Sequence, residues 1–343
     1  MQVSTTLFWG KARHDDDAIS SMHPLVAHSL DVAAVAILLS QTRGIGLPGQ
    51  TIGFLVALHD IGKFSRPFQA MAAPHWPAAA LGAWLEDRRP PPGPKHDSLG
   101  FHLLEKVFTD RLAALLPPRL PGRAGWVQGQ RVALLRALAG HHGRPPADPG
   151  RLGEAVFCAG CQAAAAGFID AMRTLFAPAP LPAPASGHAA DRMAWQLAGL
   201  TTLADWIGSR QAWFPYVGPE AVLDPAGYFW DRALPQAAAA IAAAGLANPR
   251  PARFEGLRGL FPGITTPSPA QGWAEAVELP EGPILAVIED LTGSGKTEAA
   301  LTLAHRLLAT GRASGVFMAL PTMATANAMF GRLAAAYRSL FAA

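Results

Sequence analysis

The hydrophobic pattern changes its period once along the 343 residues of the chain, and this change constrains the fold more than any other feature. Up to about residue 216 apolar residues recur at helical spacing, whereas 283–289 and 316–320 are short, almost wholly apolar runs. Such runs are typical of strands covered on both faces, and the stretch 297–310 between them has a helical pattern. The order strand, helix, strand predicts a parallel sheet with a right-handed crossover. We therefore expect a mainly α protein, with an all-helical domain followed by part of an α/β domain.

Proline-rich breaks divide the helical part into separate segments, because proline cannot continue a helix. The expected helices are 26–39, 51–59, 99–116, 131–139, 152–176, 191–207 and 237–247. The breaks, expected at the surface, are 90–94, 117–122, 145–149 and 178–186. We predict three regions: a helical domain over 1–218, a helix and irregular linker over 219–269, and an incomplete α/β domain over 270–343.

Composition excludes some classes of protein but identifies none. Hydrophobic residues make up 50% of the chain and charged residues only 15%, so a disordered, solvating chain is excluded. The formal net charge of +3 is too small to indicate a nucleic-acid partner by itself. Neither a signal peptide nor a membrane-spanning run is found in the sequence, so we expect a soluble cytoplasmic protein with no membrane partner, and a monomer.

The only cysteines, Cys158 and Cys161, have C-x-x-C spacing, which raises the alternatives of zinc binding or redox chemistry. A structural zinc needs four ligands, and the chain has no second cysteine pair. The motif also lies within an alanine-rich, helical stretch rather than at a turn between a strand and a helix. We expect both thiols to be inert, in a reducing compartment.

Histidine and aspartate residues near the ends of the expected helices are the candidate metal ligands. They are His28, His59, Asp60, His96, His141, His142 and Asp205. Several helices can direct such ligands at one interior point, as helical bundles do in metal sites. Any single histidine on an apolar helix is more often a core or surface residue, so the case depends on the group.

The adjacent pair His59 and Asp60 indicates more than one ion. Neighbouring residues within a helix point about 100° apart, but at a helix end the pair can serve two adjacent ions, with Asp60 bridging. Two ions at that spacing activate water for phosphoryl displacement. Imidazole-rich ligation favours Fe, Mn, Co or Ni over Mg. Lys63 is a candidate to neutralise phosphate charge, with solvation at the surface as the alternative.

A second motif follows the first expected strand and opens a helix, as a phosphate-binding loop does. Its residues are Thr292, Gly293, Ser294, Gly295, Lys296 and Thr297. Backbone N–H groups would hold phosphates, Lys296 would reach the β and γ phosphates of ATP, and Thr297 would bind Mg²⁺. Asp290 replaces the usual first glycine.

The two motifs together resemble known families. The string 59–63, with His28 before it and His141 and His142 after it, resembles the HD superfamily of metal-dependent phosphohydrolases. Gln271 looks like the adenine-reading glutamine of superfamily 2 helicases, and 321–327 looks like their next motif. In this order the motifs resemble the nuclease-helicase effector of type I CRISPR systems.

The resemblance implies roles and partners. It implies one metal ion held by His28, His59, Asp60 and Asp205, and a second held by Asp60, His96, His141 and His142. The implied substrate is single-stranded DNA, the displaced strand of an R-loop, and the implied partner is the Cascade surveillance complex. The histidines that match no part of the pattern are expected to be structural or solvated: His14, His23, His75, His102, His188 and His305.

The P-loop segment is expected to be inactive by itself. Full-length members of this family carry an acidic Walker B motif and a second RecA-like domain, for which there is no room before Ala343. We therefore expect no useful ATP hydrolysis or unwinding from these residues. Two other functions stay open: an HD phosphohydrolase of small nucleotides, and a non-catalytic module that docks protein or DNA.

Overall fold

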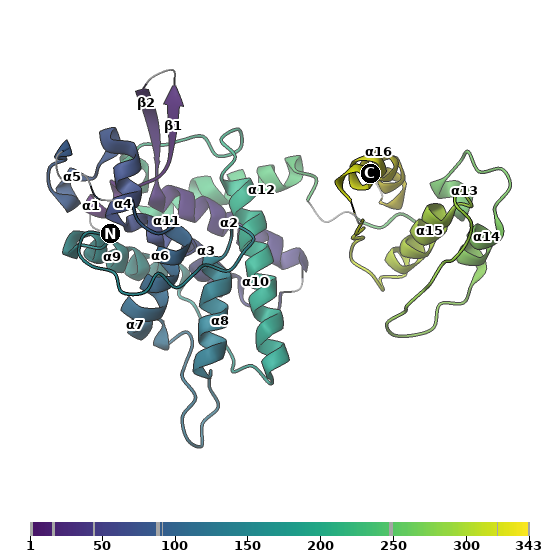
Figure 1. Cartoon of the computed structure of the whole chain (residues 1–343), viewed down its shortest axis with the longest axis horizontal. Coiled ribbons are helices and arrows are strands. Elements are labelled where there is room, and N and C mark those ends of the chain that lie inside the picture. Colours follow the sequence, from purple (N-terminus) through teal and green to yellow (C-terminus); the bar gives the residue numbers. More distant parts are fainter. Residues whose placement is uncertain are drawn as a thin grey trace. The chain divides into compact units, whose positions relative to one another are not determined.

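The computed structural model describes residues 3–15, 18–43, 45–86, 90, 92–246, 250–320 and 322–341. The chain divides into two compact units, Met1–Ala247 and Asn248–Ala343, and each is described here by itself. The mainly helical fold expected from the sequence is confirmed (Figure 1). In the described residues, no helix is long and apolar enough to cross a membrane.

The first unit consists of helices around one core, with η marking 3₁₀ or π segments. Its helical elements are α1 Val3–Thr6, α2 Leu25–Arg43, α3 Gly49–Ala57, η1 Ile61–Phe64, α4 Arg66–Gln69, η2 Ala70–His75, α5 Ala78–Leu81, α6 His96–His102, η4 Leu103–Val107, α7 Thr109–Ala113, α8 Gln128–Ala139, α9 Ala159–Phe176, α10 Gly187–Gly208, η5 Pro219–Val222, α11 Pro225–Tyr228, η6 Phe229–Ala233 and α12 Leu234–Ala243. The helix expected over 237–247 therefore begins three residues earlier and packs on α2 within this unit.

Helix α2 lies at the centre of this unit. It is buried along most of its length, from Leu25 to Ala36, and it packs against α3, α10 and α12. A helix that is apolar on every side must be covered on every side, and the surrounding helices supply that cover. Because His28 and Asp31 interrupt this apolar helix, they are placed inside the core rather than on the surface.

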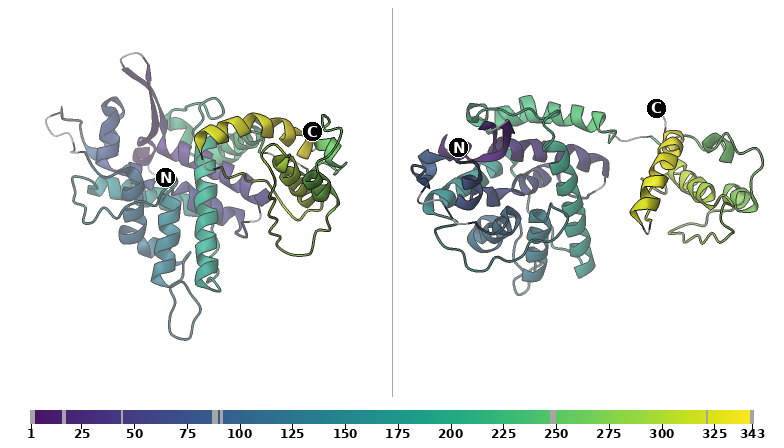
Figure 2. Two further views of the ribbon diagram at one scale, coloured as in Figure 1. Left: turned by 45° about the vertical axis from the view of Figure 1, so that its right-hand side comes forward. Right: turned by 45° about the horizontal axis from the view of Figure 1, so that its top comes forward.

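A β-hairpin was missed by the sequence analysis, which expected only helices up to residue 216. Strand β1, Trp9–Asp15, pairs antiparallel with β2, Ala18–Pro24. The left view of Figure 2 shows these strands as one ribbon extending from the helices. The hairpin starts against the core, because Trp9 and Gly10 are buried and the backbone N–H of Leu25 donates to the carbonyl of Phe8.

Two expected helices have different bounds. The stretch 99–116 is broken into α6, the π segment η4 and α7, with a break at Phe108. The helix expected over 152–176 begins only at Ala159, so Cys158 is its N-cap residue rather than an interior one. The C-x-x-C motif thus lies at a helix N-terminus, contrary to the expectation, with the two sulfur atoms within hydrogen-bond distance at 3.4 Å and no disulfide between them.

The second unit contains α13 Leu257–Leu260, α14 Pro269–Ala276, α15 Lys296–Ala309 and α16 Met323–Leu340. The strands expected over 283–289 and 316–320 are not formed in its described residues, and this part of the prediction was wrong. Leu285 and Phe317 are about nine-tenths exposed. A strand needs a hydrogen-bonded neighbour, and no described segment of this unit pairs with either run.

Candidate metal centre

The seven candidate ligands come from five places in the first unit and meet at one point. His28 lies in α2, His96 begins α6, and Asp205 lies in the last turn of α10. The pair His59 and Asp60 follows α3, and His141 and His142 follow α8. Three groupings of these residues have ligand atoms within 4.8 Å of one another: His28, His59 and Asp205; His59, Asp60 and His141; and His96, His141 and His142.

The position of the His59–Asp60 pair explains how adjacent residues can share one site. Helix α3 ends at Ala57, and Asp60 is the N-cap of η1 with φ −103° and ψ 14°. The backbone therefore leaves the helical path between the two residues. As expected from the sequence, the pair lies at a helix end, and both side chains reach the same interior point.

Asp60 presents its two carboxylate oxygens to two different sets of imidazoles. Its Oδ2 lies 3.1 Å from Nε2 of His28 and 3.3 Å from Nε2 of His59. Its Oδ1 lies 3.4 Å from Nε2 of both His96 and His141. The two oxygens of Asp60 therefore face separate pairs of imidazoles, and its bridging of two ions stays a prediction.

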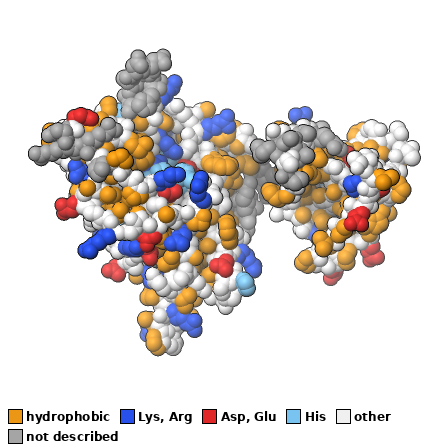
Figure 3. Space-filling model, in the orientation of Figure 1, with side chains coloured by type: hydrophobic (Ala, Val, Ile, Leu, Met, Phe, Trp, Pro, Cys, Tyr) orange, Lys and Arg blue, Asp and Glu red, His pale blue; other side chains and the backbone are white. Residues whose placement is uncertain are grey.

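The remaining two candidates are Asp205, which lies beside His28 and His59, and His142, which lies beside His96. Asp205 Oδ1 lies 3.3 Å from Nε2 of His28 and 3.7 Å from Nε2 of His59. On the other side, Nε2 of His142 lies 2.8 Å from Nε2 of His96. His142 is exposed, whereas His28, His59 and Asp60 are buried, so the second set is the one that opens to solvent. Figure 3 shows histidine at this surface beside basic side chains.

The donor atoms fit a metal ion. Nε2 of His28, Nε2 of His59 and Oδ1 of Asp60 are buried and have no hydrogen-bond partner. Nδ1 of His59 donates to the carbonyl of Val56 at 2.8 Å, which leaves the Nε2 lone pair directed at the site. Buried polar atoms without partners are costly, and a cation bound among them would satisfy them.

The charges around the site also favour a cation. Burial, together with the charge of Lys11, lowers the pKa of His28 to about 4, and burial lowers the pKa of His96 to about 4. Burial and the charge of His59 lower the pKa of His141 to about 2. The exception is His59: burial lowers its pKa, but Asp60 and Asp205 outweigh burial and raise it to about 9.

Both carboxylates stay ionised despite their burial. Burial raises the pKa of Asp60, but Lys63 and His59 outweigh this effect and hold it well below its usual value. Burial also raises the pKa of Asp205, but the neighbouring imidazoles of His28 and His59 outweigh burial and lower it. Metal ligands must be deprotonated, and most of these groups are already in that form at neutral pH.

Lys63 is buried rather than solvated, so the alternative of surface solvation is wrong. Its Nζ lies 2.5 Å from Asp60 Oδ2 and donates to the carbonyl of Gly10 at 3.1 Å. Burial lowers the pKa of Lys63, and the charge of Asp60 opposes that shift. Lys63 therefore places a cation directly against the bridging carboxylate.

Several supporting residues were given no role by the sequence analysis. Gln69 Nε2 donates to the carbonyls of Trp9 and Lys63, and its Oε1 accepts the backbone N–H of Trp9. This buried amide fixes β1 to the segment that carries Lys63. Lys11 of β1 lies 3.9 Å from Asp205 and reaches the site from the strand. No pattern in the sequence assigned Lys11 a role.

Gly62 allows the segment after Asp60 to lie against α6. A Cβ at Gly62 would stand 2.0 Å from the carbonyl oxygen of His96 and 2.4 Å from the backbone N of Gly100. Only glycine fits such a close approach of two backbones. The spacing between Asp60 and His96 thus depends on backbone contact.

The histidines outside the pattern have the structural roles expected, where they can be described. His23 is buried and pairs with Asp31 at 2.9 Å, and Asp31 also accepts from the hydroxyl of Tyr228. His305 is buried and lies 2.9 Å from the carbonyl of Ala252. His188 is exposed, His75 and His102 are half-buried, and the side chain of His14 lies outside the described residues.

The phosphate-loop residues lie together in the second unit, at the start of α15. Gly293 and Gly295 have φ of +85° and +88°, a conformation that favours glycine. Lys296 Nζ donates to the carbonyls of Asp290 and Leu291 at 2.6 Å each. Gln271, which is buried, lies so close that its amide would meet a Cβ at Gly295.

The remaining residues of the loop have different environments. Thr292 is exposed, Ser294 and Thr297 are half-buried, and Asn327 of the following motif is exposed. Pro321 of that motif lies outside the described residues. In this unit the Lys296 ammonium is bonded to carbonyls of its own loop. The candidate metal ligands of the first unit instead converge on one point.

Comparison with known proteins identifies the family. The family model described as "Cas3, HD domain" matches residues 9–214. The chain belongs to the Cas3 HD family. Its match includes all seven candidate ligands.

Two curated Cas3 relatives are similar to nearly the whole chain. The CRISPR-associated endonuclease/helicase Cas3 of Escherichia coli is 31% identical, over 97% of this chain and 40% of its own length. The protein of the same name from Thermus thermophilus is 33% identical, over 91% of this chain and 34% of its own length. The chain therefore spans well under half the length of these relatives.

Solved structures show the same likeness. A structure titled as a CRISPR-associated protein has a TM-score of 0.68 at 29% identity, covering 99% of this chain and 38% of its own. The T. fusca Cas3 structure titled with ATP has a TM-score of 0.65 at 25% identity, covering 98% of this chain and 38% of its own. The likeness to Cas3 thus extends through both units of this chain.

Proposed function

We propose that this chain is a metal-dependent nuclease that hydrolyses phosphodiester bonds of single-stranded DNA at a two-metal centre. The observation that carries the proposal is the geometry of Asp60, whose two oxygens face two separate imidazole sets. We assign His28, His59 and Asp205 with Asp60 to one ion, and His96, His141 and His142 with Asp60 to the other. The imidazole-rich donors favour Fe, Mn, Co or Ni.

The residues of the chain would prepare a phosphodiester for attack by water. When bound, two divalent ions supply an activated water and neutralise charge on the attacking and leaving oxygens. Lys63, held between Asp60 and Gly10, would add a positive charge beside the reacting phosphate. Lys11 would extend that positive charge toward the open side from β1. His142, the exposed ligand, lies where a strand would enter.

The biological setting is proposed from the relatives. Both curated relatives are named CRISPR-associated endonuclease/helicases, which supports a role in CRISPR antiviral defence. The substrate would then be the displaced strand of an R-loop, and the partner a Cascade-type surveillance complex.

We propose no ATP-driven unwinding for these 343 residues. The phosphate loop has the glycine conformations that would hold ATP with Mg²⁺. However, Lys296 is bonded to its own loop, and no described strand stands behind the loop to support it. Any contribution of this segment to unwinding would first require a strand that supports the phosphate loop.

The test is cleavage of labelled single-stranded DNA by the metal-loaded chain. Protein given Mn²⁺, Co²⁺ or Ni²⁺ should cut the DNA, and Asp60→Ala should not. Asp231→Ala, which changes an exposed aspartate of η6, is the matched control and should cut like the unmodified chain. A panel of small nucleotides run beside the DNA separates a nuclease from a nucleotide phosphohydrolase. Intact DNA with metal-loaded protein would refute the proposal.

A further inference from the structure

A groove between α8 and α10 leads to the metal centre. Both helices present their C-terminal ends to the centre: His141 and His142 follow α8, and Asp205 lies in the last turn of α10. The groove has a volume of about 650 Å³ and is lined by Gly140 and Gly143, which flank the two histidines, and by Trp206, which follows Asp205. One end of the groove therefore lies beside residues that are adjacent in sequence to three of the candidate ligands.

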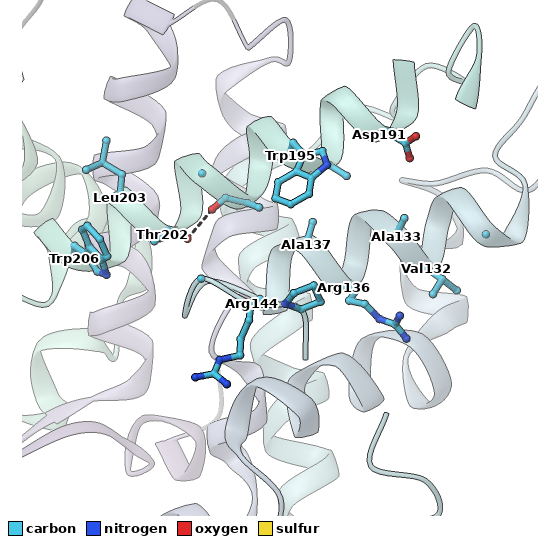
Figure 4. Close-up of a pocket in the computed structure, with 17 residues that line it drawn as sticks. Val132, Ala133, Arg136, Ala137, Arg144, Asp191, Trp195, Thr202, Leu203 and Trp206 are labelled. Atoms are coloured by element: carbon cyan, nitrogen blue, oxygen red, sulfur yellow. Dashed lines mark hydrogen bonds between the residues drawn. The ribbon is translucent and has the colours of Figure 1, made fainter. Parts of the chain in front are cut away.

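Two exposed tryptophans stand along this groove. Trp195 and Trp206 are 76% and 70% exposed, although both belong to a helix whose other face is buried in the core. Figure 4 shows both on α10, with Ala133 and Ala137 on the neighbouring helix. The groove is otherwise lined mainly by small residues, including Ala198 and Gly199, so flat groups can lie against it.

The charges favour an anion at the end of the groove nearest the metal centre. Arg144 follows His142 closely, is exposed, and has no ion-pair partner among the residues the structure describes. Arg136, one turn before the end of α8, also lines the groove and its guanidinium lies over the ring of Phe101 at 4.8 Å. Asp191, the only acid among the described residues that line the groove, lies near the other end of α10.

We propose that this groove is a base-stacking track that holds single-stranded DNA on its way to the metal centre. Unspecific single-strand sites combine aromatic side chains, on which bases stack, with arginines that follow the phosphates. Trp195 and Trp206 are eleven residues apart, about 16 Å along a helix. At a rise of about 3.4 Å for each stacked nucleotide, that distance accommodates about five nucleotides. This inference rests on the proposed substrate and adds the path by which it is bound.

The test measures binding separately from cleavage. Fluorescein-labelled oligothymidylate of eight nucleotides is titrated with the full chain in EDTA, where no hydrolysis occurs, and anisotropy reports the Kd. Trp195→Ala and Trp206→Ala should each weaken binding about five- to tenfold, and the phenylalanine variants should retain most of the affinity. Trp230→Ala is the matched control, because Trp230 is 57% exposed on η6 and does not line the groove.

A second probe separates stacking from charge. An oligonucleotide of the same length with abasic sugars should bind unmodified protein and the tryptophan variants equally, because it has no bases to stack. Arg144→Ala should lower the slope of log Kd against log salt by about one for both probes.

The outcomes also separate this inference from the proposed function. If tryptophan variants bind oligothymidylate as tightly as the unmodified chain, or if Trp230→Ala weakens binding as much, the track is wrong and the groove is left for a protein partner. If the track variants lose affinity while metal-loaded protein cuts no DNA, the track stands and the nuclease proposal fails. If the chain cuts DNA and the tryptophan variants bind normally, the nuclease proposal stands and the track fails.

Discussion

The metal centre and the phosphate loop differ in how completely each is built. In the first unit the ligands are held by packed helices, and most of them are buried with their donor atoms converging. In the second unit the loop has the right glycine conformations, but Lys296 bonds to its own carbonyls, and the apolar run before the loop is exposed. The metal centre is therefore preorganised, and the phosphate loop is not.

The difference shows what each kind of site requires. A site at helix ends needs only the helices that carry it, and those helices pack against one another within one unit. A phosphate loop depends on the strand before it, and that strand depends on neighbours that complete a sheet. If the two sites differ in this way, substitutions at the metal centre should have large effects on cleavage, and a substitution in the phosphate loop should have almost none.

Asp60→Asn should remove the metal centre's function almost completely. The substitution keeps the shape of the side chain but removes the charge shared by both ligand sets. Mutating the outer partners of metal ligands commonly costs about 10- to 100-fold, so a bridging ligand should cost more than about 100-fold in cleavage rate. Metal content per chain, measured after dialysis, should also fall. Full metal occupancy with a normal rate would show that Asp60 is not the bridge.

Gly62→Ala should disturb the spacing between the two ligand sets. The new methyl group would stand 2.0 Å from the carbonyl oxygen of His96, so η1 and α6 must separate. Overpacking of this kind typically costs about 1–3 kcal/mol in the free energy of unfolding, which denaturant titration measures. Gly129→Ala in α8 is the control, because nothing lies within 4 Å of a Cβ there. Equal stability of the two variants would contradict the close approach.

Lys63→Met should separate metal binding from catalysis. The lysine holds Asp60 Oδ2 at 2.5 Å, so its removal frees that oxygen for a cation. We expect metal affinity to rise about tenfold, the equivalent of one charge-assisted hydrogen bond of about 1.5 kcal/mol, while the cleavage rate falls. Calorimetric titration with Mn²⁺ and a cleavage assay on the same preparation measure the two effects. A parallel fall in both would instead assign Lys63 to holding the site together.

Lys296→Ala should have the smallest effect of all. If the phosphate loop of these residues is not organised for ATP, cleavage of single-stranded DNA by the first unit should stay within about twofold of the unmodified chain, because the substitution touches none of the ligands or the residues that support them. ATP hydrolysis should be at background in both proteins. A loss of cleavage on this substitution would show that the two sites are coupled.

Much of the metal centre could be predicted because its signals are local. The motif 59–63 places two ligands at a helix end, and the helical periodicity that identifies α2, α8 and α10 also places His28, His141 and Asp205 near their ends. The apolar character of α2 predicts its burial, and therefore the burial of His28. None of these steps needs knowledge of contacts between distant residues.

The remainder depends on tertiary contacts that leave no pattern. The hairpin β1–β2 is short and polar, and its first residues are buried where Gln69 and Lys63 bond to its backbone. The runs 283–289 and 316–320 have the composition of strands, but composition cannot supply a neighbouring strand. Cys158 was predicted within a helix because alanine-rich sequence hides the point at which α9 begins.

The Gln69 amide has a consequence for local unfolding. All of its bonds to β1 go to Trp9, whose indole also donates to the backbone carbonyl of Gln69. Lys63 of η1 adds a bond to the carbonyl of the next residue, Gly10, so the hairpin is joined to the η1–α4 segment at two adjacent residues of β1, and the strand can open as a unit when these neighbouring bonds break. Lys11, two residues further along β1, would leave the metal centre in the same event. The free energy of opening at Trp9 thus sets how often the site is left without that positive charge.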